Sequence, residues 1–337
     1  MIPIISELRP LGHPDSTIVP LEPFADAQSA AAGSAYTCLA MTDSQLTSTA
    51  VVTVTYNSSN ALAPFLESVG TASRDRLTVV VADNHSLDVR ETESVSLGHG
   101  ARLLKLSRNL GYGGAINAAI GTLPASIDRI LVSNPDVFLG PKSIDILNEV
   151  LDRNPHAAAV GPLVLNSDGS VYPSARALPS LRDGIGHALF VGIWPANPWT
   201  RHYRQEQESS NVERRAGWLS GSCLLIRRCA FEDIKGFDES FFMYFEDVDL
   251  GYRFAKAGWV NIYSPVARVT HTGAHSTSSD PALMIKAHHR STRLYLNRRY
   301  PARILAPLRL ILRGGLLVRE RILVFRAGRD LPKPPTL

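Results

Sequence analysis

Short runs of β-branched and other apolar residues alternate with longer amphipathic stretches from residue 51 onward. Runs typical of buried strands occupy 51–55, 77–82, 102–106 and 129–133. Between and after them, the stretches 61–69, 112–121 and 142–153 have the apolar spacing of helices. Strands and helices that alternate at this spacing predict an α/β fold built on a doubly wound, mostly parallel sheet.

The pattern becomes less regular in the second half of the chain. An apolar run at 157–165 is followed by a long irregular stretch, 168–215, that is rich in Pro, Trp and Arg. Such a stretch in a compact domain is typical of a functional surface. Regular patterning then returns at 218–227, in a helix near 247–257 and in a strand at 259–263.

Three segments follow from this pattern. Residues 1–46 are rich in Ala, Ser and Pro without periodicity, and we expect a poorly ordered leader there. Residues 47–280 are predicted to form the main domain, and 281–337 a basic helical extension that starts with a helix over 281–299. The first forty residues lack the features of a signal peptide, and the extension has no uncharged apolar stretch near the roughly 18 residues that span a bilayer.

Charge is distributed unevenly along the chain. The formal net charge is +4, yet residues 286–333 hold thirteen Lys and Arg against two acidic residues, a net of +11 that leaves −7 for the rest. A basic, leucine-rich segment attached to a mildly acidic body predicts an anionic partner surface, either a membrane or a nucleic acid.

The basic extension also has an amphipathic part. On a helical wheel one face collects the residues Ile304, Leu305, Leu308, Ile311 and Leu312. Arg303, Arg309 and Arg313 lie off that face, which predicts a helix lying in a membrane interface. Gly314-Gly315 is expected to break this helix from the following segment.

The cysteines point to no special chemistry. Cys38, Cys223 and Cys229 contain no CxxC pair, and we expect free structural thiols in a reducing compartment.

Polar side chains follow three of the predicted strands, at the points where those strands end. They are Thr55, Tyr56 and Asn57 after the first strand, Asp83 and Asn84 after the second, and Asn134 and Asp136 after the fourth. Ligands of open α/β sheets bind at the carboxyl ends of the strands, so this arrangement predicts a nucleotide cleft. The alternative is that each Asn or Asp caps the helix that follows it.

A glycine run, 111–114, lies after the third strand. It differs from a dinucleotide-binding motif because it does not follow the first strand and has Ile116 where the last glycine belongs. We expect these glycines to open a helix whose N-terminus faces the cleft and suits a phosphate group.

The densest cluster of carboxylates lies between 238 and 249, where five of them alternate with aromatic residues. Asp249 and Arg253 have the i, i+4 spacing of a helical salt bridge. Glu246 and Asp247 fall in the first turn of the same helix, where the helix dipole favours anions. Crowded carboxylates beside aromatic surface also raise one another's pKa, which suits a general base.

Two residues could bind a metal ion. Asp136 has the oxygen ligand that hard divalent cations prefer. His271 and His275 have an H-x3-H spacing, but Gly273 lies between them and no Cys or third His accompanies them. His271 as a single ligand of Mn²⁺ or Mg²⁺ is therefore favoured over a zinc centre.

Together these motifs resemble the family 2 glycosyltransferases, most closely their rhamnosyltransferase branch. The resemblance covers about 50–300. The motifs that carry it occur in the family's order: the strand-end motifs, the run 108–117, the segments 236–239 and 242–250, and His271. The stretches 169–176 and 217–225 strengthen the resemblance. It implies a GT-A fold, a dTDP-L-rhamnose donor and a polyprenyl-diphospho-N-acetylglucosamine acceptor used in synthesis of the cell-wall arabinogalactan linker. It also implies a peripheral protein on the cytoplasmic face of the plasma membrane.

The resemblance assigns roles by position. Asp83 would hold the thymine ring, Asp136 and His271 the metal ion on the diphosphate, and Asp247 would be the catalytic base. Glu246 would stand beside that base, and with Asp238 it would shape the acceptor side. The remaining matched positions are Thr55, Tyr56, Asn57, Asn84, Asn109, Gly111 and Asn134 for the donor, and Trp218 and Arg176 for the acceptor. Asn134 replaces the first Asp of the usual DxD metal motif.

Three alternatives stay open. The donor could be a different sugar nucleotide such as a UDP-sugar, since Asp83 would bind uracil equally well. A catalytically inactive, membrane-bound sugar-binding module would not need Asp136, Asp247 and His271 together. Nucleic-acid binding through the basic extension is disfavoured because the body is net acidic and offers no basic–aromatic platform.

Overall fold

The computed structural model describes residues 48–180, 211–273 and 281–329, so the predicted leader lies outside the described residues. The strands are β1 (Thr49–Thr55), β2 (Thr78–Asp83), β3 (Arg102–Lys105), β4 (Arg129–Ser133), β5 (Val137–Leu139), β6 (Ala157–Asn166), β7 (Val171–Tyr172), β8 (Ala175–Arg176), β9 (Arg214–Ala216), β10 (Trp218–Leu219), β11 (Cys223–Arg227) and β12 (Val260–His271). The helices are α2 (Ser59–Ala72), α3 (Val89–Gly98), α4 (Gly111–Ile120), α5 (Ser143–Arg153), α8 (Arg228–Asp233), α9 (Glu246–Lys256), α10 (Pro281–Arg299) and α11 (Ala306–Arg329), with a short 3-10 helix η1 (Arg303–Leu305).

The strands form one large sheet in the order β3-β2-β1-β4-β11-β6-β12-β5, with β7 beside β6 and β9 beside β12. Strands β3, β2, β1 and β4 are parallel, and β6 is parallel to β12. Because β11 is antiparallel to both β4 and β6, those two run in the same direction. The predicted doubly wound, mostly parallel α/β sheet is therefore confirmed, with β11 and β5 as the reversed strands along this path.

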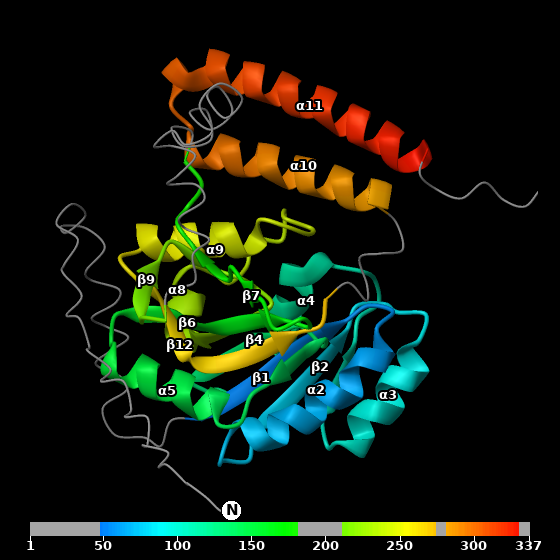
Figure 1. The fold of residues 1–337 in the computed structure, drawn as a ribbon, viewed down its shortest axis with the longest axis vertical. Helices are drawn as coiled ribbons and strands as arrows, with labels where there is room; N and C mark the ends of the chain where they lie inside the picture. Colours follow the sequence, from blue (N-terminus) through cyan, green and yellow to red (C-terminus); the bar gives the residue numbers. More distant parts are fainter. Residues whose placement is uncertain (1–47, 181–210, 274–280, 330–337) are drawn as a thin grey trace, which may run out of the picture.

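Helices cover both faces of the sheet (Figure 1). One face buries Ile116 of α4, Phe231 of α8 and Phe254 of α9. The other buries Phe65 of α2 and Leu147 of α5. Burying a side chain of this size contributes about 1.5–3 kcal/mol, which explains why β1, between the two layers, is apolar at successive positions instead of alternating.

Helix α3 was not predicted, because its buried positions are polar. Thr92 and Ser96 are buried, and their hydroxyls donate to the carbonyls of Asp88 and Thr92 one turn earlier. Hydroxyls satisfied within their own helix can be buried without the apolar spacing on which the prediction depends.

The C-terminal helices α10 and α11 form an antiparallel hairpin above the α9 side of the sheet (Figure 1). The predicted break at Gly314-Gly315 is wrong, because α11 runs through both residues. Each glycine costs about 1 kcal/mol in a helix, and packing against α10 and the ion pair of Arg293 with Glu320 offset that cost.

The residues of the predicted apolar face, 304–312, are only partly covered in the hairpin. Leu305, Leu308 and Leu312 are half-buried, whereas Ile304 and Ile311 are exposed. The wheel described one helix alone, and the position of α10 decides which of these side chains is covered.

The cysteine prediction holds for one residue and fails for another. Cys223 is buried and free. Cys229 is disulfide-bonded. A disulfide requires two cysteines to lie close together in the fold, and the spacing of cysteines along the sequence does not predict this.

Candidate active site

The carboxyl ends of β1, β2 and β4 lie next to one another. Thr55 pairs with Asp83 at the end of β1 and β2, and Thr53 of β1 pairs with Ser133 at the end of β4. The polar residues that follow these strands are therefore brought to one edge of the sheet, as predicted.

Asp83 is one of the most deeply buried of the predicted donor residues, at 1% exposed. Its Oδ2 accepts a hydrogen bond from Thr55 Oγ1 (3.3 Å), and its Oδ1 accepts one from the Ser86 amide (3.0 Å). A carboxylate has about four acceptor positions, so two remain for a ligand N–H.

Tyr56 and Asn57 form the rim beside Asp83. Tyr56 is exposed. Asn57 adopts a positive φ of 51°, and its Oδ1 accepts the amide of Leu87 (2.8 Å), which ties this rim to the loop that precedes α3.

Asn84 and Asn109 hold the start of α4. The Asn84 side chain accepts the Leu110 amide (2.8 Å) and donates to Asn109 Oδ1 (2.9 Å), which also accepts the Gly111 amide (2.9 Å). Gly111 has φ 76°, and a Cβ there would lie 2.2 Å from the Phe242 carbonyl oxygen. Only glycine fits this position, and the run opens a helix at the cleft as predicted.

The two predicted metal ligands are in contact. Strand β5 pairs with β12 so that Val137 lies opposite His271, and His271 Nε2 is 3.1 Å from Asp136 Oδ1. Asn134 Nδ2 lies 3.4 Å from the same imidazole nitrogen. The ring of Tyr172, which the prediction omitted, packs edge-on against His271 with 6.3 Å between centroids.

The described residues contain no group of three His, Cys, Asp or Glu side chains arranged to hold a metal ion. Asp136 and His271 nevertheless fit Mg²⁺ or Mn²⁺, because such ions are held by one or two protein ligands and complete their shell with substrate phosphates. The pair suits a metal ion that arrives with a diphosphate.

The carboxylate centre lies at the start of α9. Asp247 Oδ2 accepts the Gly221 amide (3.0 Å) and its Oδ1 accepts the Val248 amide (2.8 Å). Burial raises the pKa of the Asp247 carboxyl, while these amides and the nearby Arg176 charge oppose that shift.

Glu246 has a different environment. Burial, followed by the adjacent Asp247, raises the pKa of Glu246 to about 8. Its Oε2 is buried and accepts no hydrogen bond within the described part of the chain. Burial and the neighbouring charge therefore favour the protonated form of Glu246, whereas two amide donors stabilise the ionised form of Asp247.

Tyr112 joins the parts of the site, and sequence reasoning gave it no role. Its hydroxyl donates to the Gly221 carbonyl (2.6 Å), and the Gly221 amide donates to Asp247. Burial and then the charges of Glu246, Asp247 and more weakly Asp136 raise the pKa of Tyr112, which places it near both carboxylate groups. The sequence signal for this role was a single tyrosine hydroxyl within an otherwise apolar helical stretch.

The backbone before α9 is strained. Tyr244 and Phe245 have φ values of 65° and 67°. Non-glycine residues occupy this region at a cost of about 1–3 kcal/mol each, and such residues cluster at active sites.

The predicted acceptor residues divide into two places. Pairing of β8 with β10 sets Arg176 opposite Trp218, and the guanidinium lies 5.5 Å from the Trp218 ring and 6.0 Å from that of Tyr172. Asp238 instead pairs with Arg298 of α10 and with Ser240. Burial alone would raise the pKa of Asp238, but the hydrogen bonds from Arg298 and Ser240 lower it.

A cavity of about 540 Å³ lies elsewhere, at the amino end of β4. Its charged residues pair with one another, Arg129 with Asp152 and Arg228 with Glu232. We assign the chemistry to the carboxyl edge, because the buried carboxylates and the His–Asp pair lie there.

Comparison with known proteins agrees with this geometry. The family model "Glycosyltransferase like family 2" matches residues 45–293. N-acetylglucosaminyl-diphospho-decaprenol L-rhamnosyltransferase of Mycobacterium tuberculosis is 48% identical over 283 residues, which cover 81% of this chain and 92% of that protein. Rhamnosyltransferase WbbL of Escherichia coli K12 is 28% identical over 74% of this chain and 92% of its own length.

Two solved structures share the fold. GalNAc-T7, crystallised with UDP, GalNAc and Mn²⁺, has a TM-score of 0.52 at 15% identity over 75% of this chain and 48% of its own. Staphylococcus aureus TarS 1–349 with UDP-GlcNAc has a TM-score of 0.50 at 15% identity over 74% of this chain and 67% of its own. These similarities confirm the predicted GT-A fold.

Proposed function

The chain belongs to glycosyltransferase family 2, and from that premise we propose that it transfers L-rhamnose from dTDP-L-rhamnose to polyprenyl-diphospho-N-acetylglucosamine. The name of the mycobacterial relative supports the sugar and the lipid-linked acceptor. The observation that carries the proposal is the half-buried carboxylate of Asp247, together with the Asp136–His271 pair. Tyr112 lies close enough to Asp247 and to Asp136 for both charges to raise its pKa.

Asp247 acts as the base. Its carboxylate takes the proton of the acceptor hydroxyl while the hydroxyl oxygen forms the new bond to the anomeric carbon. The bond from that carbon to the diphosphate oxygen breaks, and its electron pair leaves with dTDP, so the configuration inverts. The proton stays on Asp247 and later passes to solvent. A base held in this way contributes about 10²–10⁴-fold to the rate.

Asp136 and His271 would hold Mn²⁺ or Mg²⁺, which would supply positive charge to the departing diphosphate. The Asn134 side chain lies next to this pair. Because Asn134 stands at the first Asp position of the DxD motif, the site has an uncharged amide where a third charged ligand would otherwise lie. The N-terminus of α4 at Gly111, positioned by Asn84 and Asn109, adds the positive end of the helix dipole, which favours a phosphate group.

Asp83 accepts the ring N–H of the thymine, and Thr55, Tyr56 and Asn57 border the base. Arg176 and Trp218 form the acceptor side next to Asp247, where the flat indole suits a sugar face and the guanidinium suits a phosphate. Asp238 contributes to the acceptor side indirectly, because its ion pair with Arg298 fixes its own segment against α10.

The protein works as a peripheral protein on the inner face of the plasma membrane. No helix within the described residues is long and apolar enough to cross a bilayer. The outer face of α11 and η1, which we call the outer apolar strip, exposes Ile304, Leu310, Ile311, Leu317, Val318, Ile322 and Phe325. Exposed arginines, among them Arg313, Arg319 and Arg326, border it. Apolar side chains beside arginines suit an anionic lipid surface.

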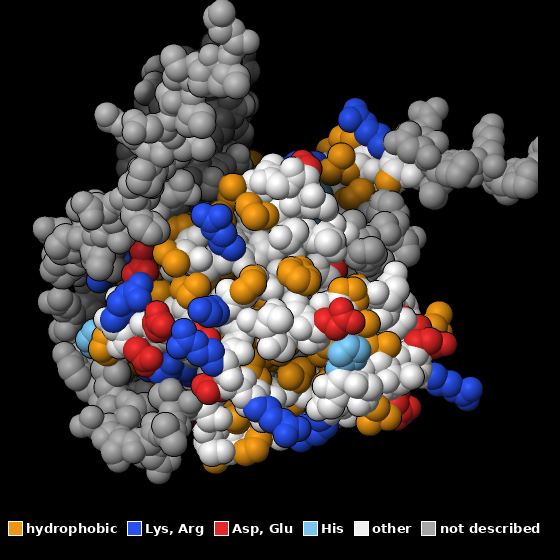
Figure 2. All heavy atoms as spheres, turned by 60° about the horizontal axis from the view of Figure 1, so that its bottom comes forward, with side chains coloured by type: hydrophobic (Ala, Val, Ile, Leu, Met, Phe, Trp, Pro, Cys, Tyr) orange, Lys and Arg blue, Asp and Glu red, His pale blue; other side chains and the backbone are white. Residues whose placement is uncertain are grey.

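The opposite side of the molecule differs. Figure 2 shows Lys and Arg interspersed with Asp and Glu over the face that carries the ends of α2 and α5. Mixed charge of this kind favours neither a lipid surface nor a nucleic acid, which supports placing the membrane contact on the hairpin.

A transfer assay tests the proposed function. Purified protein with Mn²⁺ or Mg²⁺ should move rhamnose from dTDP-rhamnose to a polyprenyl-diphospho-GlcNAc acceptor, and Asp247→Asn in the same preparation serves as the blank. UDP-GlcNAc and UDP-galactose are the donor controls. Equal or faster transfer from a UDP-sugar would contradict the donor assignment and leave the lipid-linked acceptor in place.

A further inference from the structure

The loop before α9 holds a conformation that its own residues disfavour. We call residues 241–245 the catalytic loop, because it leads directly into Glu246 and Asp247. Tyr244 and Phe245 both have positive φ, and neither is a glycine. A strained loop persists only where the surrounding structure holds it, so the groups that contact it indicate what positions the base.

One contact is a hydrogen bond from α10. Ser291 is 3% exposed, and its Oγ donates to the carbonyl oxygen of Met243 at 2.8 Å. Met243 is the residue immediately before the two strained positions. The bond therefore acts at the point where the backbone enters the left-handed region.

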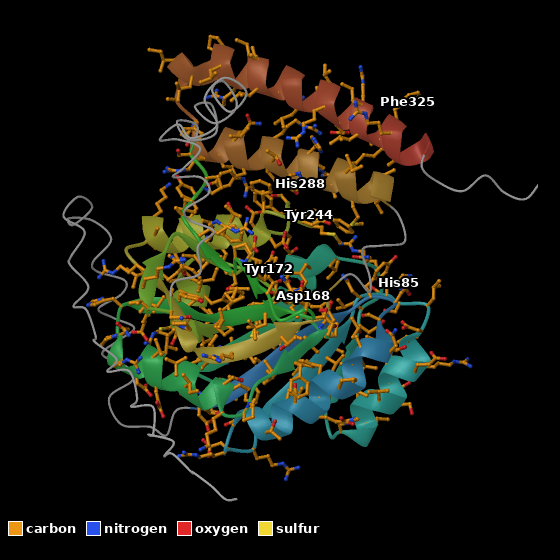
Figure 3. The ribbon with its side chains drawn as sticks, viewed as in Figure 1. His85, Asp168, Tyr172, Tyr244, His288 and Phe325 are labelled. Carbon is orange, nitrogen blue, oxygen red and sulfur yellow. The ribbon has the colours of Figure 1, made fainter. Side chains whose placement is uncertain are left out.

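The other contacts are aromatic and come from the same helix. The His288 ring lies 5.6 Å from the Tyr244 ring and 5.5 Å from the Phe245 ring. Tyr295, which is 1% exposed, lies 5.5 Å from Phe245. Figure 3 shows Tyr244 and His288 pointing toward one another from the catalytic loop and α10.

The opposite side of the catalytic loop rests on the donor half of the site. The Tyr112 amide donates to the Phe242 carbonyl at 3.1 Å, and Gly111 leaves no room there for a Cβ. The catalytic loop is thus held between α4, which bears Tyr112, and α10. A displacement on the α10 side moves the carbonyl that Tyr112 contacts.

We propose that α10 is a positioning element for the catalytic base, and that Ser291 is its main positioning residue. The proposal rests on the proposed function of Asp247. Because α10 is tied to α11 by the ion pair of Arg293 with Glu320, the hairpin that carries the outer apolar strip also holds the catalytic loop.

The test uses two hydroxyl deletions one residue apart. Ser291→Ala removes the bond to Met243. Thr292→Ala removes a hydroxyl that, among the described residues, bonds only the His288 carbonyl of its own helix. In the full-length protein we expect Ser291→Ala to lower kcat about five- to twenty-fold, with KM for dTDP-rhamnose changed by less than about two-fold. Thr292→Ala should leave both within about two-fold of wild type.

A second readout does not need activity. Hydrogen exchange of the Tyr112 and Asp249 amides, which bond the carbonyls of Phe242 and Phe245, should be faster in Ser291→Ala and unchanged in Thr292→Ala. His288→Ala serves as a second variant with an exposed side chain; it should raise the same exchange rates, and it keeps the test informative if Ser291→Ala folds poorly.

The outcomes separate the two proposals. If the wild type transfers no rhamnose but Ser291→Ala and His288→Ala still loosen the catalytic loop, the proposed donor or acceptor is wrong and the positioning role stands. If both variants match Thr292→Ala in exchange and in kcat, α10 does not position the loop and this inference is overturned.

Discussion

The carboxyl edge of the sheet and the α10–α11 hairpin use their side chains in opposite ways. At the edge, polar groups are bound and wholly or partly buried: Asp83 and Asp247 each accept two hydrogen bonds from the protein. On the outside of the hairpin, large apolar groups such as Ile311 and Val318 are more than half exposed. Burial tunes acid–base chemistry at the edge, whereas exposure leaves a surface free to contact something else.

The difference also separates the expected effects of substitution. Groups at the edge work in a dry environment where each charge and hydrogen bond counts strongly. Each side chain on the outer apolar strip contributes a small, additive share of the free energy of binding to a surface, so a single substitution there has a smaller effect. The predictions below test this contrast, beginning with the largest effect.

The largest loss should come from Asp247→Asn. Turnover should fall by about 100-fold or more, because the amide cannot accept the acceptor proton. Donor binding measured by calorimetry should not change. Glu239→Gln, an exposed neighbour in the same acidic segment, is the control and should retain activity. Near-normal turnover of Asp247→Asn would remove the residue from the role of base.

The metal pair should have the next largest effect. Asp136→Ala and His271→Ala should each lower activity by roughly ten-fold or more and raise the Mn²⁺ or Mg²⁺ concentration needed, since each removes one of few protein ligands. EDTA should abolish activity and added metal should restore it. Asp168→Ala, an exposed aspartate on the β6–β7 turn (Figure 3), should behave as wild type. Full activity after thorough chelation would overturn the metal assignment of both residues.

Asp83→Ala should act on the donor alone. A lost contact of about 1–3 kcal/mol raises KM for dTDP-rhamnose by roughly 5- to 150-fold, while KM for the lipid acceptor stays near its original value. Calorimetry with dTDP measures the same contact without turnover. If dTDP binds the variant as tightly as the wild type, Asp83 serves only to hold Thr55 and the Ser86 turn.

The hairpin should respond more weakly. Replacing Ile311 and Val318 together by serine should lower sedimentation with anionic vesicles by roughly ten-fold, because two apolar side chains no longer leave water. Activity on long-chain acceptors should fall by a few-fold and activity on short soluble ones should not. Leu97→Ser, which alters an exposed apolar residue on α3, is the control.

Raised salt should release part of the bound wild type, because the arginines contribute an electrostatic attraction. Unchanged sedimentation of the double variant would show that the outer apolar strip is not the lipid contact.

Glu246→Gln should have the smallest effect at pH 7, within about two-fold on kcat, because the wild-type side chain is already protonated there. The reverse result, a loss as large as that of Asp247→Asn, would make Glu246 the base.

The same substitution should change how stability depends on pH. The pKa of Glu246 rises from an ordinary 4.5 to about 8 in the fold. Its contribution to stability is thus complete below about pH 4.5 and is lost as the pH rises through about 8. Urea unfolding at pH 5 and pH 8 should show the wild type losing free energy of unfolding relative to Glu246→Gln, whereas equal changes in the two proteins would contradict the raised pKa.

Several features of the site were readable in the sequence because they depend on neighbours in the chain. Apolar runs such as β4 mark strands that are buried on both faces. Asp249 and Arg253 lie one helical turn apart and form the predicted salt bridge, with Nε and Oδ2 2.6 Å apart. Residues that follow parallel strands must meet at one edge, so the positions of Asp83 and Asp136 followed from the strand pattern alone.

Other features depend on segments far apart in the chain. Tyr112 gained its role from Gly221, 109 residues away, and Asp238 is bound by Arg298, 60 residues away. Local periodicity carries no record of such pairs. The pair of glycines inside α11 misled the prediction for a related reason, since their cost is offset by contacts with α10. The buried hydroxyls of α3 misled it for a local reason, because they are satisfied within their own helix.

The sequence by itself determined the alternation of the main strands and helices, the residues at the strand ends and the membership of this chain in its family, because periodicity and motif spacing are local properties. Only the tertiary structure decided which carboxylate stays protonated, which face of α11 remains exposed and which helix holds the strained loop before the base. Those outcomes depend on burial and on contacts between distant segments, and both arise only when the chain has folded.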